Sequence, residues 1–384
     1  MERFKVVEEK ESDIEKCYEG KKMMSQVKIG VVIPCYKVKE YILDVLSKIG
    51  SEVTHIYCVD DACPQSSGLF ISENVADCRI KIIYHKENEG VGGAVISGYK
   101  AALQDGVDVI VKLDGDGQMD PALIARMIYP VVSGEADYAK GDRFYKAEYL
   151  KQMPAIRKAG NAFLSFMNKF SSGYWQIFDP TNGFTAISAS VARELPFERI
   201  SKRYFFESDV LFQLGLLRAV VRDVPIKAVY QGEVSSLKIG KILFEFITGH
   251  LYHFMVRVLY NYFIRNFTLG SIELVFALLF ILFGLIVGGV HWTSSIMTGV
   301  TASAGTVMLS ALPIMLGFQL VLAFFSEDIS LVPKIPVSKN NNSADFTSPL
   351  LSYLAEAKKS SKISEIMLVE PTVDPQVFVR KESD

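Results

Sequence analysis

The sequence predicts an α/β domain with a mostly parallel sheet, followed by helices at a membrane surface and a hairpin of two transmembrane helices. Three observations predict this architecture. Short β-branched runs alternate with helical segments over residues 27–236, the runs repeatedly end in acidic or amide residues, and the long uncharged apolar stretches lie after residue 268. Strands that alternate with helices pair in parallel, and the helices then cover both faces of the sheet.

Each element of the α/β part follows from its own residues. Apolar runs rich in valine and isoleucine predict strands at 28–36, 54–62, 81–90 and 107–118. Helical periodicity predicts helices at 41–50, 92–103 and 156–170, and an apolar helix within 203–214. Further strands are expected at 137–141 and within 178–188. Ligands of such sheets bind beyond the carboxyl ends of the strands, where six residues fall: Tyr36, Asp60, Asp61, Asn88, Asp114 and Asp116.

The composition of the 384 residues excludes several classes of protein. Hydrophobic residues make up 49% of the chain, which is too many for a disordered protein. Five cysteines, an odd number spread over a long chain, do not form a disulfide framework. The net charge of −2 leaves no basic excess to neutralise phosphates, so we expect no nucleic-acid partner.

The mean hydropathy of +0.22 is high because apolar residues are concentrated near the C-terminus. Residues 271–291 carry only Glu273 as an ionisable residue before His291, and their ~20 residues at ~1.5 Å each match a hydrocarbon core of ~30 Å. Residues 300–325 have no charge, although Pro313 and several polar residues interrupt them. We predict two transmembrane helices; the alternative for the second is a buried globular helix.

Charge and periodicity divide the chain into five parts. Residues 1–26 are charged and lack an apolar segment, so we expect an extension and no signal peptide. The α/β domain spans residues 27–236. The periodicity of residues 237–267 predicts amphipathic helices in the membrane interface, or alternatively a helix packed on the domain. Residues 268–326 hold the two spans, and 327–384 a weakly structured tail. Basic residues flank the spans, so we expect an integral membrane protein with both termini and the α/β domain in the cytoplasm.

The strongest motif is LDGDGQMDP, at residues 113–121. Asp114, Asp116 and the amide oxygen of Gln118 are hard oxygen ligands that suit Mg²⁺ or Mn²⁺. Such a metal keeps positions for phosphate oxygens and neutralises charge on a departing diphosphate. The alternative for an isolated D-x-D is a solvated acidic turn, but the other acid-ended strands favour a metal site.

The remaining motifs each allow two interpretations. Asp60 in VDDAC either accepts hydrogen bonds from a nucleotide or closes an Asx turn. The glycines around Gly92 either bring backbone amides to a phosphate or form a tight turn, and their spacing does not match a dinucleotide-binding fingerprint. Arg143 and Arg157 suit phosphate, although single arginines are more often solvated. Asp209 begins an apolar helix, where it caps the helix or holds a sugar hydroxyl or an arginine.

The motifs of this chain, taken in order, resemble those of the family-2 inverting glycosyltransferases of GT-A fold, which is Rossmann-like. They are P-x-Y, D-D, N-x-G-x-G, D-x-D-x-Q, G-x-R, T-x-G-F and F-E-x-D. The interfacial helices and the two-helix hairpin resemble the polyprenyl-phosphate branch of that family, and the resemblance covers residues 28–325. It implies transfer of a sugar from a UDP- or GDP-sugar to a polyprenyl phosphate, for cell-envelope glycan synthesis. The lipid bilayer is then a partner, and a homo-oligomer is left open.

The resemblance also implies roles for single residues. The nucleotide-sugar site would comprise Pro34, Tyr36, Asp60, Asp61, Asn88, Gly92 and Asp114, with Asp60 on the base. The metal would be bound by Asp114, Asp116 and Gln118. The acceptor phosphate would be held by Arg143, Arg157, Ser236 and Lys238, and the catalytic set would be Asp116, Arg143, Arg157 and Asp209. Two motifs depart from the family: the usual P-x-Y-N-E reads Pro34-Cys35-Tyr36-Lys37-Val38, and the usual D-D-G-S reads Asp60-Asp61-Ala62-Cys63.

A lipid phosphate is largely dianionic at neutral pH, because its second pKa is near ~6, and it attacks the anomeric carbon without a general base. Two alternatives remain. A transferase acting on a glycan hydroxyl needs a base, for which Asp209 is the candidate. A nucleotide-sugar-binding membrane protein without catalysis is opposed by the intact acids and arginines.

Overall fold

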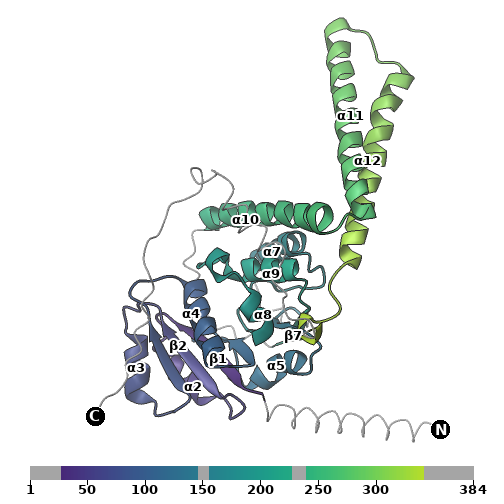
Figure 1. The fold of residues 1–384 in the computed structure, drawn as a ribbon. Coiled ribbons are helices and arrows are strands. Elements are labelled where there is room, and N and C mark those ends of the chain that lie inside the picture. The colour runs from purple at the N-terminus through teal and green to yellow at the C-terminus, as the bar shows by residue number, and fades with distance from the viewer. Residues whose placement is uncertain (1–26, 146–154, 227–238, 341–384) are drawn as a thin grey trace, which may run out of the picture. The chain divides into compact units, whose positions relative to one another are not determined.

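The computed structural model describes residues 27–145, 155–226 and 239–340, which form two compact units. The first unit holds residues up to Leu251 and those from Pro333, and the second holds Tyr252–Val332. Figure 1 shows a sheet with packed helices in the first unit and a long helical hairpin in the second.

The first unit contains a seven-stranded sheet in the order β3-β2-β1-β4-β6-β5-β7. The strands are β1 (Ile29–Cys35), β2 (His55–Asp60), β3 (Ile80–Tyr84), β4 (Val109–Lys112), β5 (Tyr138–Asp142), β6 (Thr185–Ser188) and β7 (Val221–Pro225). Among them only β6 runs opposite to its neighbours, β4 and β5, and the other pairs are parallel. The predicted mostly parallel sheet is therefore confirmed.

Helices cover both faces of this sheet because the central strands are apolar on both sides. In β1, Val31 and Ile33 pack in one core with residues of α2 (Ile42–Ser47) and α5 (Ile124–Val132). On the opposite face, α4 (Val91–Gln104) approaches so closely that a Cβ on Gly98 would collide with the Val32 side chain. The remaining helices of this unit are α3 (Ser67–Asn74), α7 (Ala155–Ser172), α8 (Ala189–Glu194) and α9 (Phe206–Leu217), with short 3-10 turns at Pro121–Leu123, Phe197–Arg199 and Val337–Asn340.

The predicted surface helices form one long helix, α10 (Ile239–Leu259), followed by a π-helical turn at Tyr260–Arg265. Within the first unit, His250 is buried, its ring lies 4.9 Å from Phe205, and its Nδ1 lies 2.8 Å from the Ser171 hydroxyl. Phe244 and Leu251 instead expose 70% and 56% of their surface. The first part of α10 therefore packs on the α/β domain and also exposes large apolar side chains, which suits a membrane surface.

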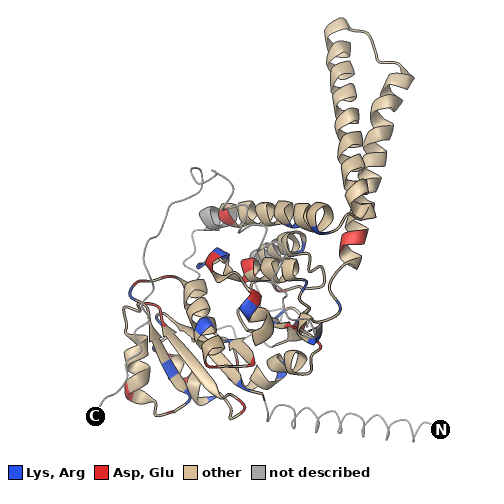
Figure 2. Ribbon diagram, viewed as in Figure 1, with Lys and Arg blue, Asp and Glu red and all other residues tan. Residues whose placement is uncertain are grey.

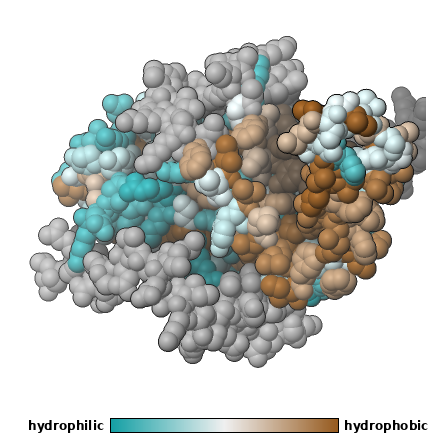
Figure 3. All heavy atoms as spheres, turned by 90° about the horizontal axis from the view of Figure 1, so that it is seen from above, coloured by the Kyte–Doolittle hydropathy of each residue, from teal (hydrophilic) through white to brown (hydrophobic). Residues whose placement is uncertain are grey.

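The hairpin consists of α11 (Leu269–Thr298) and α12 (Ala304–Ser330), both long and apolar enough to cross a membrane by length and composition. Figure 2 shows that they carry few charges, and Figure 3 shows hydrophobic side chains over this part of the chain. Glycines bring the helices together, since a Cβ on Gly284 would lie 2.6 Å from the Ser310 carbonyl oxygen. In the same unit, buried Arg257 donates to both carboxylate oxygens of Asp328 at 2.6 and 3.0 Å.

The predicted tail boundary at residue 327 differs from the structure. The helix α12 continues to Ser330, and the described start of the tail is anchored in the first unit. The N–H groups of Val337 and Ser338 each donate to the buried Asp137 carboxylate at 2.9 Å. No local residue pattern predicts this anchor, because Asp137 lies about 200 residues earlier in the chain.

Candidate active site

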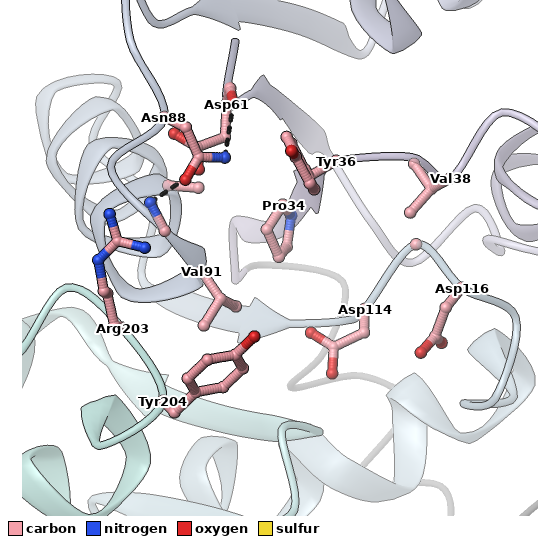
Figure 4. A pocket seen from close by; sticks show the side chains of 13 residues that line it. Pro34, Tyr36, Val38, Asp61, Asn88, Val91, Asp114, Asp116, Arg203 and Tyr204 are labelled. Carbon is pink, nitrogen blue, oxygen red and sulfur yellow. Dashed lines mark hydrogen bonds between the residues drawn. The ribbon is translucent and has the colours of Figure 1, made fainter. Parts of the chain in front are cut away.

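A cavity of about 440 Å³ opens beyond the carboxyl ends of β1, β2 and β4 (Figure 4). Its walls come from five segments: Pro34, Tyr36 and Val38; Asp61; Asn88, Gly90, Val91 and Ala94; Asp114, Gly115 and Asp116; and Arg203 and Tyr204. The structure thus brings together most of the residues predicted for a nucleotide-sugar site. Asp60, Gly92 and Gln118 do not line the cavity.

The Asp60 carboxylate closes the turn after β2 and does not reach the cavity. It is buried, one oxygen accepts from the Cys63 N–H at 2.7 Å, and the other accepts from the Gly68 N–H at 2.6 Å. This is the turn-forming alternative that the sequence left open. Asp60 therefore supports the site through the backbone, and its predicted contact with a nucleotide base stays a prediction.

Asp61 shapes the cavity wall by joining the end of β2 to the loop before α4. Its carboxylate accepts from the N–H groups of Glu89 and Gly90 at 2.9 and 2.8 Å, and the His85 ring lies 2.7 Å from it. The Asn88 side chain donates to the Asp61 carbonyl oxygen at 3.2 Å. Asp61 and Asn88 thus lie at the site as predicted, and the Asp61 carboxylate already accepts several hydrogen bonds.

The two departures from the family motifs occupy positions of unusual backbone. Ala62 has φ +49° where the family pattern has glycine, and Lys37 has φ +59° where it has asparagine. Glycine and asparagine adopt this region most readily. Cys63 replaces the usual serine, and its Sγ accepts from the Lys37 N–H at 3.1 Å. Burial raises the pKa of the Cys63 thiol, but hydrogen bonds from Ser67 and the backbone outweigh burial, and the pKa is lowered.

The glycines at the N-terminus of α4 serve packing. A Cβ on Gly90 would lie 2.6 Å from the Lys202 carbonyl oxygen, and one on Gly92 would lie 2.5 Å from that of Ser201. The Gly93 N–H donates to the Lys202 oxygen at 3.2 Å. These glycines therefore leave room for the segment that carries Arg203 and Tyr204, a packing role that neither interpretation of the motif had included.

Arg203 and Tyr204 are site residues that the sequence analysis missed. Figure 4 shows the Arg203 guanidinium beside Asn88 and the Tyr204 ring between Val91 and Asp114. Within the part of the chain that the structure describes, no ion pair or hydrogen bond involves the Arg203 guanidinium. In the sequence, these two residues are indicated only by their position shortly before the F-E-x-D motif. That position does not show which side chains face the edge of the sheet.

The two acids of the D-x-D motif both line the cavity, and their carboxylate oxygens are of the type that binds a hard cation. Asp114 accepts from Lys112 Nζ through Oδ1 at 2.9 Å, and Asp116 accepts from the Gln118 N–H through Oδ1 at 3.0 Å. Among the described residues no group of three or more His, Cys, Asp or Glu could hold a metal. Two carboxylates suit a cation such as Mg²⁺ that completes its shell with water and substrate phosphates.

Lys112 was also not predicted as a site residue. It lies at the end of β4, just before this motif. Its side chain is 1% exposed, and its Nζ donates to Asp114 Oδ1 at 2.9 Å and to Glu207 Oε1 at 3.2 Å. Burial lowers the pKa of Lys112, but the Asp114 and Glu207 carboxylates outweigh burial and raise it. The lysine is therefore charged and paired within the sheet.

Of the predicted acceptor and catalytic residues, Asp116 lines the cavity, whereas Arg143 and Asp209 do not. Arg143 makes a two-pronged ion pair with the fully buried Asp179, at 2.7 and 2.9 Å. Asp209 is buried in the first turn of α9 and accepts from the Ser201 N–H at 2.7 Å, so it holds the segment before Arg203 and does not cap the helix. Arg157 lies on α7, but its side chain is outside the described residues, as are Ser236 and Lys238.

Comparisons with known proteins agree with these features. Residues 30–196 match the family described as glycosyl transferase family 2. The chain is 30% identical over 221 residues to the UDP-N-acetylglucosamine–dolichyl-phosphate N-acetylglucosaminyltransferase of Methanococcus voltae, covering 54% of this chain and 88% of the relative. It is 28% identical over 227 residues to the undecaprenyl-phosphate mannosyltransferase of Micrococcus luteus, covering 58% and 92%. The glucosyl-3-phosphoglycerate synthase of Mycobacterium tuberculosis with bound UDP has a TM-score of 0.48 at 17% identity, covering 62% of this chain and 83% of that one.

Proposed function

This chain belongs to glycosyl transferase family 2, and from that premise we propose that it transfers a sugar from a UDP- or GDP-sugar to a polyprenyl phosphate at the cytoplasmic face of a membrane. The names of its relatives from Methanococcus voltae and Micrococcus luteus support this acceptor class. The observation that carries the proposal is the paired Asp114 and Asp116 in a cavity at the sheet edge, within a chain that also holds two membrane-length helices.

The donor would bind in the cavity with its diphosphate at the D-x-D motif. Asp114 and Asp116 would hold Mg²⁺ or Mn²⁺, which when bound neutralises the charge of the leaving diphosphate. Arg203, exposed at the wall, is placed to donate to a donor phosphate, and charge-assisted bonds of this kind are strong. Tyr36 is 43% exposed and offers a ring on which a base would stack.

The acceptor phosphate would attack the anomeric carbon directly and invert it. A dianionic phosphate needs no general base, and the buried Asp209, bonded to the Ser201 N–H at 2.7 Å, is not placed to act as one. Arg143 and Arg157, with Ser236 and Lys238, would hold the acceptor phosphate and reduce its repulsion from the donor diphosphate. Asp179 orients Arg143 for this role through its two-pronged ion pair.

The hairpin would fix the enzyme in the bilayer where its acceptor resides. Helices of 30 and 27 residues are longer than the ~20 residues needed to cross a core of ~30 Å. The exposed apolar side chains of α10 would lie at the headgroup level, with the α/β domain and both termini in the cytoplasm.

Incubation of membranes containing the chain with radiolabelled UDP- and GDP-sugars, followed by extraction into organic solvent, tests the function. The proposal predicts label in the lipid phase that is lost with Asp116→Asn and is acid-labile, as a lipid phosphosugar is. Label only in polymer would indicate a glycan hydroxyl as acceptor, and no label with any donor, despite measurable nucleotide binding, would indicate a non-catalytic binding protein.

A further inference from the structure

The T-x-G-F motif lies directly against the Lys112–Asp114 pair. A Cβ on Gly183 would collide with Lys112 Nζ and lie 2.5 Å from Asp114 Oδ2. No other side chain fits at position 183 while the pair stays in place. The loop is fixed by its neighbour, because Asn182 Nδ2 donates to the Gly141 carbonyl oxygen at 2.7 Å and Asn182 Oδ1 accepts from the Phe184 N–H at 3.0 Å.

The F-E-x-D motif supplies the other side of the pair. Glu207 lies in the first turn of α9, its side chain is 14% exposed, and it accepts from Lys112 at 3.2 Å. Three charged groups from β4, the loop after it and α9 therefore meet in a row, with the lysine in the middle. A buried lysine costs free energy unless carboxylates neutralise it, and here two of them do.

We propose that Lys112 is a positioning residue for the metal site: anchored by Glu207, it holds Oδ1 of Asp114 and leaves Oδ2 to ligate the divalent cation that accompanies the nucleotide diphosphate. Gly183 keeps that second oxygen uncovered. Glu207 balances the lysine charge, so the lysine orients the ligand without adding a net positive charge beside the cation. This inference rests on the metal site of the proposed function.

The test measures Mn²⁺ binding to the full chain in detergent, with UDP or GDP present, from the electron paramagnetic resonance signal of free Mn²⁺. Lys112→Met is expected to weaken Mn²⁺ binding by about 10- to 100-fold, the usual effect of removing a group that orients a metal ligand. Lys140→Met is the matched control. Lys140 is also fully buried, on β5 of the same sheet, but its Nζ donates to the Asn182 carbonyl oxygen at 2.6 Å and not to Asp114.

Both variants lose a buried lysine, so both are expected to melt earlier, but only Lys112→Met is expected to lose Mn²⁺ affinity. A Lys112→Met variant that melts cooperatively and binds Mn²⁺ as tightly as the unaltered chain, or more tightly, overturns the proposal. An equal loss of affinity in Lys140→Met overturns it too, because the effect would then be general destabilisation.

Gly183→Ala tests the same arrangement if Lys112→Met does not fold. It leaves all three charged groups in the chain but forces the lysine and the carboxylate to move, so it is also expected to weaken Mn²⁺ binding. Unchanged affinity in Gly183→Ala overturns the proposal. A parent chain that binds Mn²⁺ with these variant effects but labels no lipid would refute the proposed function alone, whereas a parent chain that transfers sugar without binding Mn²⁺ would refute this inference alone.

Discussion

The two acids of the D-x-D motif are predicted to be separable, since the structure uses them differently. Asp114 is paired with a buried lysine, whereas the Asp116 carboxylate accepts from the Gln118 N–H in its own loop. Asp114→Asn and Asp116→Asn are both expected to abolish sugar transfer, because each removes a charged metal ligand. Only Asp114→Asn is expected to destabilise the fold.

The magnitude follows from the environment of Lys112. Removing one partner of a buried ion pair costs about 3–5 kcal/mol. Here Lys112 keeps Glu207 at 3.2 Å, and the asparagine oxygen still accepts a hydrogen bond, so we expect a loss of ~2–3 kcal/mol for Asp114→Asn. At ~2–4 °C for each kcal/mol in a domain of this size, Tm falls by ~4–12 °C. Asp116→Asn keeps the acceptor for the Gln118 N–H and is expected to stay within ~1 kcal/mol of the unaltered chain.

Thermal unfolding followed by circular dichroism, on the same detergent samples used for the transfer assay, measures both effects. Asp44→Asn is the control, since Asp44 also pairs with a lysine, Lys48, at 2.5 Å but is 62% exposed, and surface pairs of this kind contribute little. If Asp114→Asn melts at the same temperature as Asp116→Asn, the lysine does not depend on Asp114. Retained transfer in Asp116→Asn would remove the D-x-D motif from the reaction.

Arg203→Met is expected to weaken binding of the donor nucleotide sugar by about 10- to 100-fold in calorimetry, because charge-assisted hydrogen bonds are lost. Lys202→Met, which removes a neighbouring exposed cation, is the control and is expected to have no effect. Equal donor affinity in Arg203→Met and the unaltered chain would exclude Arg203 from the donor site. Ala62→Gly is expected to raise the free energy of unfolding by up to ~1 kcal/mol in urea titrations, because it relieves a φ of +49°, and a loss of stability would contradict this reason. Burial raises the pKa of Asp223 from 3.8 to about 7, so the folded chain keeps a proton that the unfolded chain releases, and stability falls as pH rises between these values by at most ~4 kcal/mol. In Asp223→Asn, most of this pH-dependent decrease in stability is expected to be absent when unfolding is measured between pH 5 and 8. A pH profile identical to that of the unaltered chain would refute this prediction.

The sequence predicted β1 and β2 nearly to their ends because these strands are buried and read as continuous apolar runs. The predicted runs 81–90 and 107–118 extend well past the observed ends of β3 at Tyr84 and of β4 at Lys112. The sequence did not predict β7, whose residues Val-Arg-Asp-Val-Pro alternate with polar side chains at the edge of the sheet. Nor did it predict the reversed direction of β6. Strand direction depends on where the chain crosses the sheet, and no local residue pattern records it.

The hairpin was predicted in position but not in extent. Apolar residues at 271–291 and 300–325 mark the hydrocarbon-facing part, whereas the helices run over Leu269–Thr298 and Ala304–Ser330. Helical hydrogen bonds continue through polar residues until a cap ends them. Gly299, with φ +71°, ends the first helix, and the Ser303 hydroxyl accepts from the Thr306 N–H to begin the second.

The acids at the strand ends show what the motifs alone do not distinguish. In the D-D pair, Asp60 and Asp61 both accept hydrogen bonds from backbone N–H groups, and one of the donors, Gly68, lies eight residues away. A carboxylate bonded in this way holds the local backbone in place. In the D-x-D pair, Asp114 contacts a buried lysine at the end of the preceding strand, which bonds to one carboxylate oxygen and leaves the other. Both pairs were predicted as site residues because both follow a strand. Their roles differ because the fold brings different backbone N–H groups, and in one case a buried lysine, to each carboxylate. The metal site at Asp114 and Asp116 therefore stays our prediction, whereas the observed role of the D-D pair is to hold the backbone around the cavity.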